Sequence, residues 1–153
     1  MIKKGDSSPL VKIVYSTYYE DLTNNMLQSI EATFESNNTE YLKSEVNGVW
    51  EIPYKIKSFT HDYKYFIAVG VLIKGETDHY NYISSAVSNA LMNLTINEGV
   101  YISNAILNVQ NIKQATKRSF TKGEESALAS INIINNDCSM LYLIKRTSST
   151  LRE

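Results

Sequence analysis

The segment from Tyr65 to Ile73 restricts the fold more than any other part of the sequence, because it is apolar at nearly every residue. A strand that buries both faces has this composition, whereas a strand with one face in water alternates between apolar and polar residues. Such fully buried strands occur mainly in parallel sheets that helices cover on either side. The segment therefore predicts a strand inside a parallel sheet.

A helix is predicted after this strand, and the junction between the two carries reactive groups. The helix is indicated by apolar residues three and four apart: Ile83, Ala86, Val87, Ala90, Leu91 and Leu94. Gly75, Thr77 and His79 lie at the junction. The first N–H groups of a helix attract anions, and an imidazole transfers protons near neutral pH. We predict an anion pocket with His79 as its acid–base group; the alternative is a histidine that only hydrogen-bonds a neighbour.

The rest of the chain continues the alternation of strands and helices. Further strands are predicted at residues 10–15, 41–46 and 100–107, and further helices at 22–36, 52–59, 110–117 and 123–135. This order is typical of a parallel sheet with helices on both faces. No repeat, low-complexity tract or linker divides the sequence. We therefore predict one domain over residues 1–153, with an N-terminal arm at 1–9 and a C-terminal tail at 137–153.

Several polar and aromatic residues follow directly after predicted strands. In parallel sheets ligands bind beyond the carboxyl ends of the strands, where such residues gather. The residues expected at this edge are Tyr18, Trp50, Thr77, His79 and Asn108. Tyr18 and Tyr19 follow the first predicted strand, where exposed rings would stack on a planar ligand; the alternative is ordinary packing. Glu51 is an acceptor for substrate hydroxyls or amines, or else a carboxylate that favours the helix dipole.

A basic stretch lies between the last two predicted helices. It contains Arg118 and Lys122. As a solvated loop this stretch has no role in binding. Folded beside Gly75 and Thr77, it supplies the positive charge that a phosphate group requires.

The composition argues against several classes of function. A net charge of -1 gives no field that attracts nucleic acid or an anionic membrane. No apolar stretch approaches the length of a membrane span, and the N-terminus lacks the apolar region of a signal peptide. The single cysteine, Cys138, fits a reducing cytoplasm. Neither a cysteine–histidine metal cluster nor a glycine-rich phosphate or dinucleotide loop is present in the sequence.

Four motifs in order give the chain a resemblance to the lumazine synthase family. Residues 70–83, Gly-Val-Leu-Ile-Lys-Gly-Glu-Thr-Asp-His-Tyr-Asn-Tyr-Ile, resemble that family's signature. Weaker matches are Gly48 to Pro53, Asn111 to Ala115 with Arg118, and Lys122-Gly123 leading into Ala127 to Ala129. The resemblance covers residues 11–136. It implies a three-layer αβα sandwich with a parallel four-stranded flavodoxin-like sheet.

The resemblance also implies a reaction and a set of site residues. The family condenses 5-amino-6-(D-ribitylamino)uracil with 3,4-dihydroxy-2-butanone 4-phosphate, and needs no metal or redox cofactor. His79 is the implied proton shuttle, and Tyr18 the residue that stacks on the pyrimidine. The implied ribityl-site residues are Val49, Trp50 and Glu51; those at the pyrimidine edge are Val71, Leu72 and Ile73; and those at the phosphate are Glu76, Thr77, Arg118 and Lys122.

Some positions depart from the family pattern and keep alternatives open. Asn104 stands where the family usually has a phenylalanine that packs on the ring from the neighbouring subunit, and an amide does not stack. The chain could therefore be a non-catalytic flavin- or lumazine-binding homologue. A flavodoxin-like electron carrier is a further alternative, but the segment from Tyr15 to Tyr19 lacks the glycine of a phosphate-binding loop.

The expected assembly is a homo-oligomer with shared active sites. A pentamer is favoured over a 60-subunit shell, because the loop expected between Arg118 and Lys122 is shorter than the one that shell-forming members carry. A shorter connection changes the angle between its flanking helices and so the surface between pentamers. Nucleic acid and membranes are not expected partners.

Overall fold

The protein, described by a computed structural model, contains one parallel sheet. The description covers residues 9–150, with side chains as far as residue 144, so the predicted arm lies outside it except for Pro9, as do the last three residues of the tail. The strands are β1 (Val11–Ser16), β2 (Tyr41–Val46), β3 (Tyr65–Ile73) and β4 (Tyr101–Val109). Their order is β2-β1-β3-β4, and every pair is parallel.

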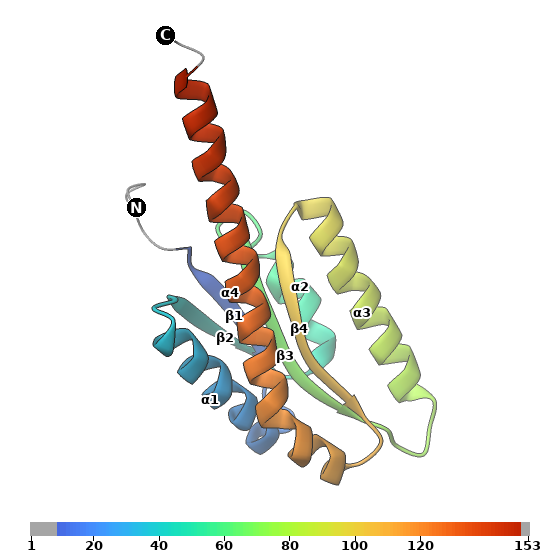
Figure 1. Cartoon of the computed structure of the whole chain (residues 1–153). Coiled ribbons are helices and arrows are strands. Elements are labelled where there is room, and N and C mark those ends of the chain that lie inside the picture. Colours follow the sequence, from blue (N-terminus) through green and yellow to red (C-terminus); the bar gives the residue numbers. More distant parts are fainter. Residues whose placement is uncertain (1–8, 151–153) are drawn as a thin grey trace.

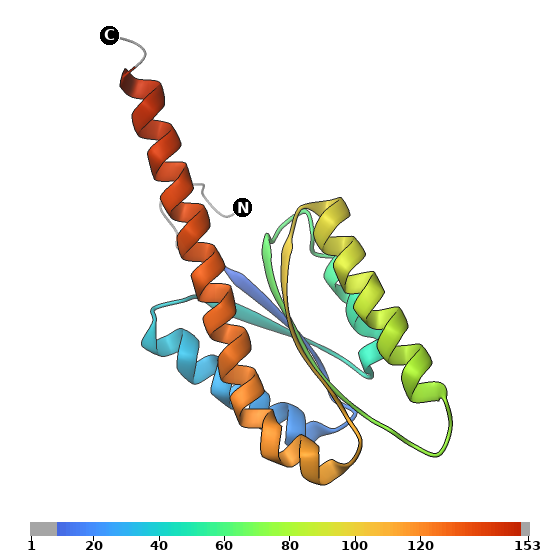
Figure 2. The same cartoon turned by 45° about the vertical axis from the view of Figure 1, so that its right-hand side comes forward.

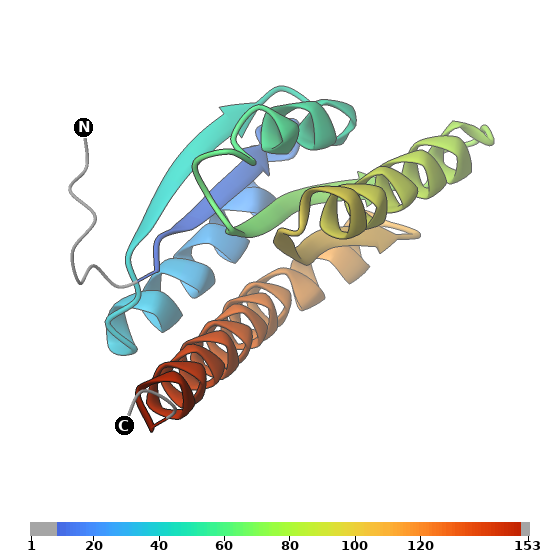
Figure 3. The same ribbon diagram turned by 90° about the horizontal axis from the view of Figure 1, so that it is seen from above.

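Helices cover both faces of this sheet (Figures 1 and 3). Helices α1 (Glu20–Ser36) and α4 (Ile112–Thr150) lie on one face, and α2 (Ile52–Lys57) and α3 (His79–Glu98) lie on the other. A short 3-10 turn, η1 (Val49–Glu51), precedes α2. The α/β fold predicted from the sequence, with its parallel four-stranded sheet between two helical layers, is thus confirmed.

The predicted strand 65–73 matches β3 at both ends, and its first seven residues are buried. The second strand, predicted at 41–46, also matches, and it is a largely exposed edge strand. The helix predicted after strand 65–73 is α3, which ends at Glu98; the next residue, Gly99, has a φ of 63° in the left-handed region that glycine tolerates. Side chains on the two faces of β3 therefore pack into two separate cores, one under each pair of helices.

The prediction of two short helices at residues 110–117 and 123–135 is wrong, because α4 is a single helix of 39 residues (Figure 2). The glycine taken as the start of the second helix lies inside it. A Cβ on Gly123 would stand 2.4 Å from the Met26 carbonyl oxygen and 3.0 Å from Ser29 Cβ. Ser29 Oγ also donates a hydrogen bond of 2.7 Å to the Phe120 carbonyl. Gly123 therefore allows α4 to cross close to α1, and it does not interrupt the helix.

The predicted C-terminal tail also belongs to α4 as far as Thr150. At the amino edge of the sheet, Asp137 accepts a hydrogen bond of 2.7 Å from the Tyr65 hydroxyl and pairs with Lys64 at 3.1 Å. These contacts attach α4 to the beginning of β3. Within the described part of the chain, no helix has both the length and the apolar composition needed to cross a membrane.

Candidate active site

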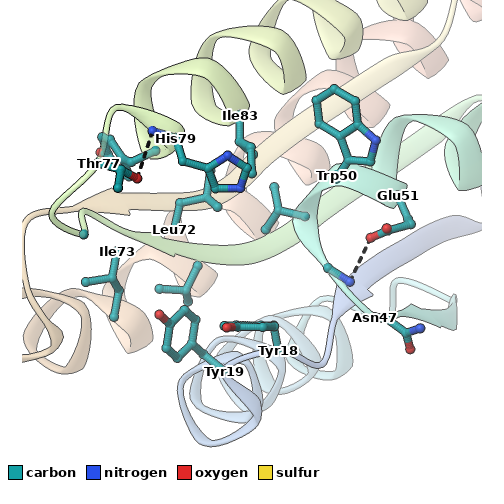
Figure 4. A pocket seen from close by; sticks show the side chains of 15 residues that line it. Tyr18, Tyr19, Asn47, Trp50, Glu51, Leu72, Ile73, Thr77, His79 and Ile83 are labelled. Atoms are coloured by element: carbon teal, nitrogen blue, oxygen red, sulfur yellow. Dashed lines mark hydrogen bonds between the residues drawn. The ribbon is translucent and has the colours of Figure 1, made fainter.

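A pocket of about 480 Å³ opens at the carboxyl edge of the sheet (Figure 4). The connection after β1 leads to the edge strand β2, and the connection after β3 leads to the opposite edge strand, β4. The two connections therefore diverge from the point where β1 and β3 lie side by side. In open α/β sheets this divergence is the usual place for a ligand. Three connections line the pocket: β1 to α1 with Tyr18 and Tyr19; β2 to α2 with Asn47, Gly48, Val49, Trp50 and Glu51; and β3 to α3 with Val71, Leu72, Ile73, Gly75, Thr77, His79, Tyr80 and Ile83.

His79 is the first residue of α3, and its imidazole lies on the side of the pocket opposite Tyr18 and Tyr19 (Figure 4). Its backbone N–H donates to Thr77 Oγ1 at 3.4 Å. Asp78 caps the helix without a side-chain hydrogen bond. The hydroxyl, the helix N-terminus and the imidazole are thus brought together, as the spacing of these residues in the sequence predicts.

The carboxylate of Glu51 occupies the wall formed after β2. Its Oε2 accepts a hydrogen bond of 2.9 Å from the Gly48 backbone N–H (Figure 4). A Cβ on Gly48 would lie 3.0 Å from the same oxygen, so glycine leaves the carboxylate room to approach the backbone. The second carboxylate oxygen has no hydrogen-bond partner among the described residues, which leaves it available as an acceptor.

Two large aromatic side chains of the pocket are exposed to solvent. Tyr18 is 75% exposed and Trp50 is 61% exposed, far more than aromatic rings that pack in a core. The rings of Tyr18 and Tyr19 are nearly perpendicular, with their centroids 5.0 Å apart. The open aromatic surface suits a planar ligand that stacks on it.

Nine of the residues predicted to form the site line this pocket: Tyr18, Val49, Trp50, Glu51, Val71, Leu72, Ile73, Thr77 and His79. Four others do not: Glu76, Asn104, Arg118 and Lys122. Glu76 is exposed in the loop between two lining residues. Asn104 lies on β4, where its Oδ1 accepts a hydrogen bond of 3.0 Å from its own chain's Ile106 N–H.

Arg118 and Lys122 correct the sequence-based expectation. They were expected in a loop, either solvated or folded beside Gly75 and Thr77, but both lie in α4 and neither lines the pocket. Among the described residues that line the pocket there is neither lysine nor arginine. Asn108, expected at the carboxyl edge, lies within β4 and accepts a hydrogen bond of 3.0 Å from Ser84.

Sequence reasoning did not assign Asn47, Tyr80 or Ile83 to the site, although all three line the pocket. Asn47 directly follows β2, so the rule that placed Tyr18 and Trp50 at the carboxyl edge also applies to it. Nothing in the sequence identified Tyr80 as a site residue apart from its position directly after His79. Ile83 was assigned to the core through its helical spacing, and it contacts the core while also facing the pocket.

Known proteins are similar to this chain over most of its length. A family model described as 6,7-dimethyl-8-ribityllumazine synthase matches residues 9–137. A protein of Agrobacterium fabrum (strain C58 / ATCC 33970) bearing that name is 32% identical over 139 residues, covering 84% of this chain and 94% of its own length. Proteins of the same name from Bartonella bacilliformis and Limosilactobacillus reuteri are 31% and 32% identical, over 88% and 81% of this chain and 93% and 84% of their own lengths.

Proposed function

The chain belongs to the 6,7-dimethyl-8-ribityllumazine synthase family, an enzyme family of riboflavin biosynthesis, and we propose that it catalyses the reaction that gives the family its name. It joins 5-amino-6-(D-ribitylamino)uracil to 3,4-dihydroxy-2-butanone 4-phosphate and releases phosphate and water. The observation that carries this proposal is that Thr77 and His79 of the first motif line one pocket with Tyr18 and Glu51. We place the reaction in the cytoplasm, where a chain with the single cysteine Cys138 needs no disulfide.

The aminouracil occupies the aromatic side of the pocket in this proposal. Tyr18 stacks on the pyrimidine, and the backbone of Val71 to Ile73 meets its polar edge. The ribityl chain runs along Val49 and Trp50, where the carboxylate of Glu51 accepts hydrogen bonds from its hydroxyls. The support is geometric, since all of these residues line the same pocket, and the free Glu51 oxygen is the acceptor that a sugar alcohol requires.

His79 transfers protons during the condensation. The aminouracil amine attacks the ketone carbon and water leaves to form an imine, and the phosphate is then eliminated. Both steps move a proton between carbon, nitrogen and oxygen atoms of the bound substrates. A general acid–base group contributes roughly 10²–10⁴ in rate, and orientation of the two substrates contributes further. His79 is the residue on the pocket wall whose side chain commonly performs this transfer near neutral pH.

The phosphate requires positive charge, and among the described residues neither lysine nor arginine lines the pocket of one chain. Thr77 and the N-terminus of α3 offer hydrogen-bond donors, with Glu76 beside them, while Arg118 and Lys122 lie elsewhere on the chain. We place the Arg118 and Lys122 of a neighbouring copy at this phosphate, and its Asn104 near the pyrimidine. A guanidinium meets two phosphate oxygens at once, which makes Arg118 the main anchor.

The assembly that shares sites in this way is a pentamer in our proposal. Helix α3 carries no lysine, arginine, aspartate or glutamate before Glu98, and its Tyr82, Met92 and Ile96 are exposed. Trp50 and Pro53 form a shallow apolar groove with Ala86, Val87 and Ala90 of α3. These surfaces suit contact with another copy. The continuous α4 removes the loop that shell-forming members use, so assembly stops at the pentamer.

The proposed activity is tested by mixing the protein with both substrates and following the fluorescence of the lumazine product. The expected result is product formation by the native protein and a rate lowered by about 10²-fold or more in His79→Ala. The second candidate is a homologue that binds flavin or lumazine without catalysis, which Asn104 favours because an amide does not stack on the ring. Binding of lumazine without any product formation would select that candidate.

A mixture of two inactive variants tests the shared site. His79→Ala removes the acid–base group from the pocket of its own chain. Arg118→Ala removes the phosphate-binding side chain that its chain offers to a neighbour. Dissociated and reassembled together in equal amounts, they should regain activity at roughly a quarter of the sites, where an intact pocket meets an intact Arg118. No recovery would place Arg118 in its own chain's site. Analytical ultracentrifugation separately distinguishes the pentamer from a shell or a monomer.

A further inference from the structure

Ser16 is a buried hydroxyl beneath the pocket that no role described above uses. It is the last residue of β1 and is 1% exposed. Its Oγ donates to the Asn47 carbonyl at 3.3 Å and accepts from the Tyr18 backbone N–H at 3.3 Å. A serine hydroxyl can donate once and accept as well, so both bonds form together. Ser16 therefore connects the end of β1 with the end of β2 from beneath the pocket.

The connection continues to the carboxylate of Glu51. The carbonyl that accepts from Ser16 and the Gly48 N–H belong to one peptide group, between residues 47 and 48. That N–H donates to Glu51 Oε2 at 2.9 Å. The hydrogen-bonded series thus runs from the Tyr18 N–H through the Ser16 hydroxyl and the 47–48 peptide to the Glu51 carboxylate. Each bond in such a series polarises the next one and strengthens it.

We infer that Ser16 is a positioning residue for the aminouracil, holding the ring-binding Tyr18 and the ribityl-binding Glu51 at a fixed separation. It acts through the 47–48 peptide, whose orientation it fixes on the carbonyl side. Without the hydroxyl, this peptide can rotate and carry the Gly48 N–H away from the carboxylate. Because Ser16 is buried, bulk water does not readily replace the lost partner. The roles of Tyr18 and Glu51 in this inference rest on the proposed function.

The packing around Ser16 supports a fixed geometry at this point. Gly70 of β3 lies beside it, and a Cβ on Gly70 would meet Val49 Cγ2 at 2.6 Å and Ser16 Cβ at 3.5 Å. Val49 therefore fills the space above Gly70, and its neighbours Trp50 and Glu51 extend to the pocket. A rotation of the 47–48 peptide would change the start of η1, which carries all three side chains.

The first test is Ser16→Ala, with Thr17→Ala as its matched control. Thr17 Oγ1 also donates to a backbone carbonyl of β2, that of Val46, but this carbonyl already accepts from the Thr17 N–H at 3.0 Å. Ser16→Ala should raise the KM for the aminouracil by about twofold to tenfold, the range expected for lost hydrogen bonds. The KM for the butanone phosphate should stay unchanged, and Thr17→Ala should change neither. Equal rises for both substrates, or no rise, would overturn the inference.

A second pair of variants separates the hydroxyl from packing. Ser16→Thr keeps the hydroxyl and Ser16→Val replaces it with a methyl group of the same shape, so any crowding by the added carbon affects both. The aminouracil KM should be lower in Ser16→Thr than in Ser16→Val. The effect of Ser16→Ala should also shrink when Glu51→Gln is already present, because the two residues act together. Full additivity in this double-mutant cycle would leave Ser16 a structural residue only.

Failure of the inference is distinguishable from failure of the proposed function. Trp50 is the single tryptophan and lines the pocket, so quenching of its fluorescence reports aminouracil binding without turnover. A native protein that binds but makes no lumazine refutes the proposed function, and the dissociation constants still test Ser16. Faster hydrogen exchange of the Tyr18 amide in Ser16→Ala, compared with Thr17→Ala, tests the bond with no ligand present. Unchanged exchange would count against it.

Discussion

The two faces of the sheet are covered to different degrees by helices of the same chain. On one face, α1 buries seven of its residues, Phe34 among them, against the sheet and α4. On the other, α3 is 20 residues long and buries only Val87 and Leu91. Hydrogen bonds from Ser29, Ser103 and Tyr65 also link α4 to α1 and to the sheet. Helix α1 is thus packed within its own chain, whereas α3 keeps Tyr82, Met92 and Ile96 exposed for another copy to cover. Helix α4 also exposes apolar side chains, Phe120 and Leu128 among them.

This difference indicates on which side a second copy can add residues to the pocket. The pocket borders the incompletely covered face, because Trp50 lines both the pocket and the shallow groove beside α3. A second copy placed on that face would lie next to the substrate, where the Arg118 of its own α4 can reach the pocket. The asymmetry thus supports a site shared between copies on the α3 side.

The largest effect is expected where the covered face is most tightly packed. Phe34 is fully buried between α1 and the sheet. Phe34→Ala should lower the free energy of unfolding by about 3–5 kcal/mol, from lost burial and the cavity left behind. Leu128 of α4 is 43% exposed, and Leu128→Ala serves as the control, with about 0.5 kcal/mol or less expected. Urea unfolding measures both. Equal losses would show that the packing of this face does not depend on its buried layer.

The next effect concerns the α3 face and should appear in association rather than in folding. Ile96 is 71% exposed on α3. Ile96→Lys should leave the folded chain intact, since exposed substitutions usually change stability by about 0.5 kcal/mol or less. It should weaken self-association by about 3 kcal/mol if the charge is buried against another copy. Sedimentation velocity compares it with Gln28→Lys, an exposed position on α1. An unchanged oligomer would remove α3 from the interface.

A smaller effect is expected at the crossing of α1 and α4. In an exposed helix, a change from glycine to alanine stabilises by about 1 kcal/mol. At Gly123 the added Cβ meets the Met26 carbonyl oxygen at 2.4 Å, so Gly123→Ala should instead destabilise by about 1–3 kcal/mol. Ser139→Ala, at an exposed position of the same helix, should be neutral or slightly stabilising. Thermal unfolding of both variants shows whether Gly123→Ala lowers or raises the stability of the protein. Stabilisation by Gly123→Ala would show that the helices can separate without cost.

The sequence predicted the sheet well because its strands carry local signals. The apolar run at residues 65–73 matches β3 at both ends. Most of the lining residues followed from the rule that ligands bind at the carboxyl ends of strands and from the family motifs. The failures occurred where contacts distant in sequence decide the outcome. The low helix propensity of glycine favoured a break before Gly123, but its close approach to Met26 makes it a packing residue inside α4.

The exposure of α3 was likewise outside what periodicity can predict. Spacing identifies the apolar stripe from Ile83 to Leu94, but not whether the chain itself or another copy covers it. The same limit applies to Arg118, whose motif marks it as a site residue although it does not line its own chain's pocket. The hydrogen bond from Ser16 to the Asn47 carbonyl joins segments 31 residues apart and gave no sequence signal.

The smallest effect concerns the attachment of α4 to β3 through Tyr65 and Asp137, whose counterpart on the α3 face is the hydrogen bond from Ser84 to Asn108 of β4. Burial of Tyr65 and its hydrogen bond to Asp137 raise the pKa of the tyrosine above its usual value. The folded chain therefore keeps this proton at pH values where the unfolded chain, with a tyrosine pKa of about 10, has lost it. The contribution of Tyr65 to stability is complete below pH 10 and declines as the pH rises further.

Tyr65→Phe tests this attachment. The variant lacks the hydroxyl, so at neutral pH it should be less stable by about 1 kcal/mol, the usual net value of one hydrogen bond. Above pH 10 the native protein should lose stability faster than the variant, and the two urea-unfolding curves should converge. The hydrogen bond from Tyr65 is also the main cause of the lowered pKa of Asp137, so acidification through the range of that carboxylate should narrow the difference as well. If the difference in the free energy of unfolding between the native protein and Tyr65→Phe stays constant from pH 3 to pH 11, this contact does not hold α4 on the sheet. The covered face would then depend on its apolar layer alone.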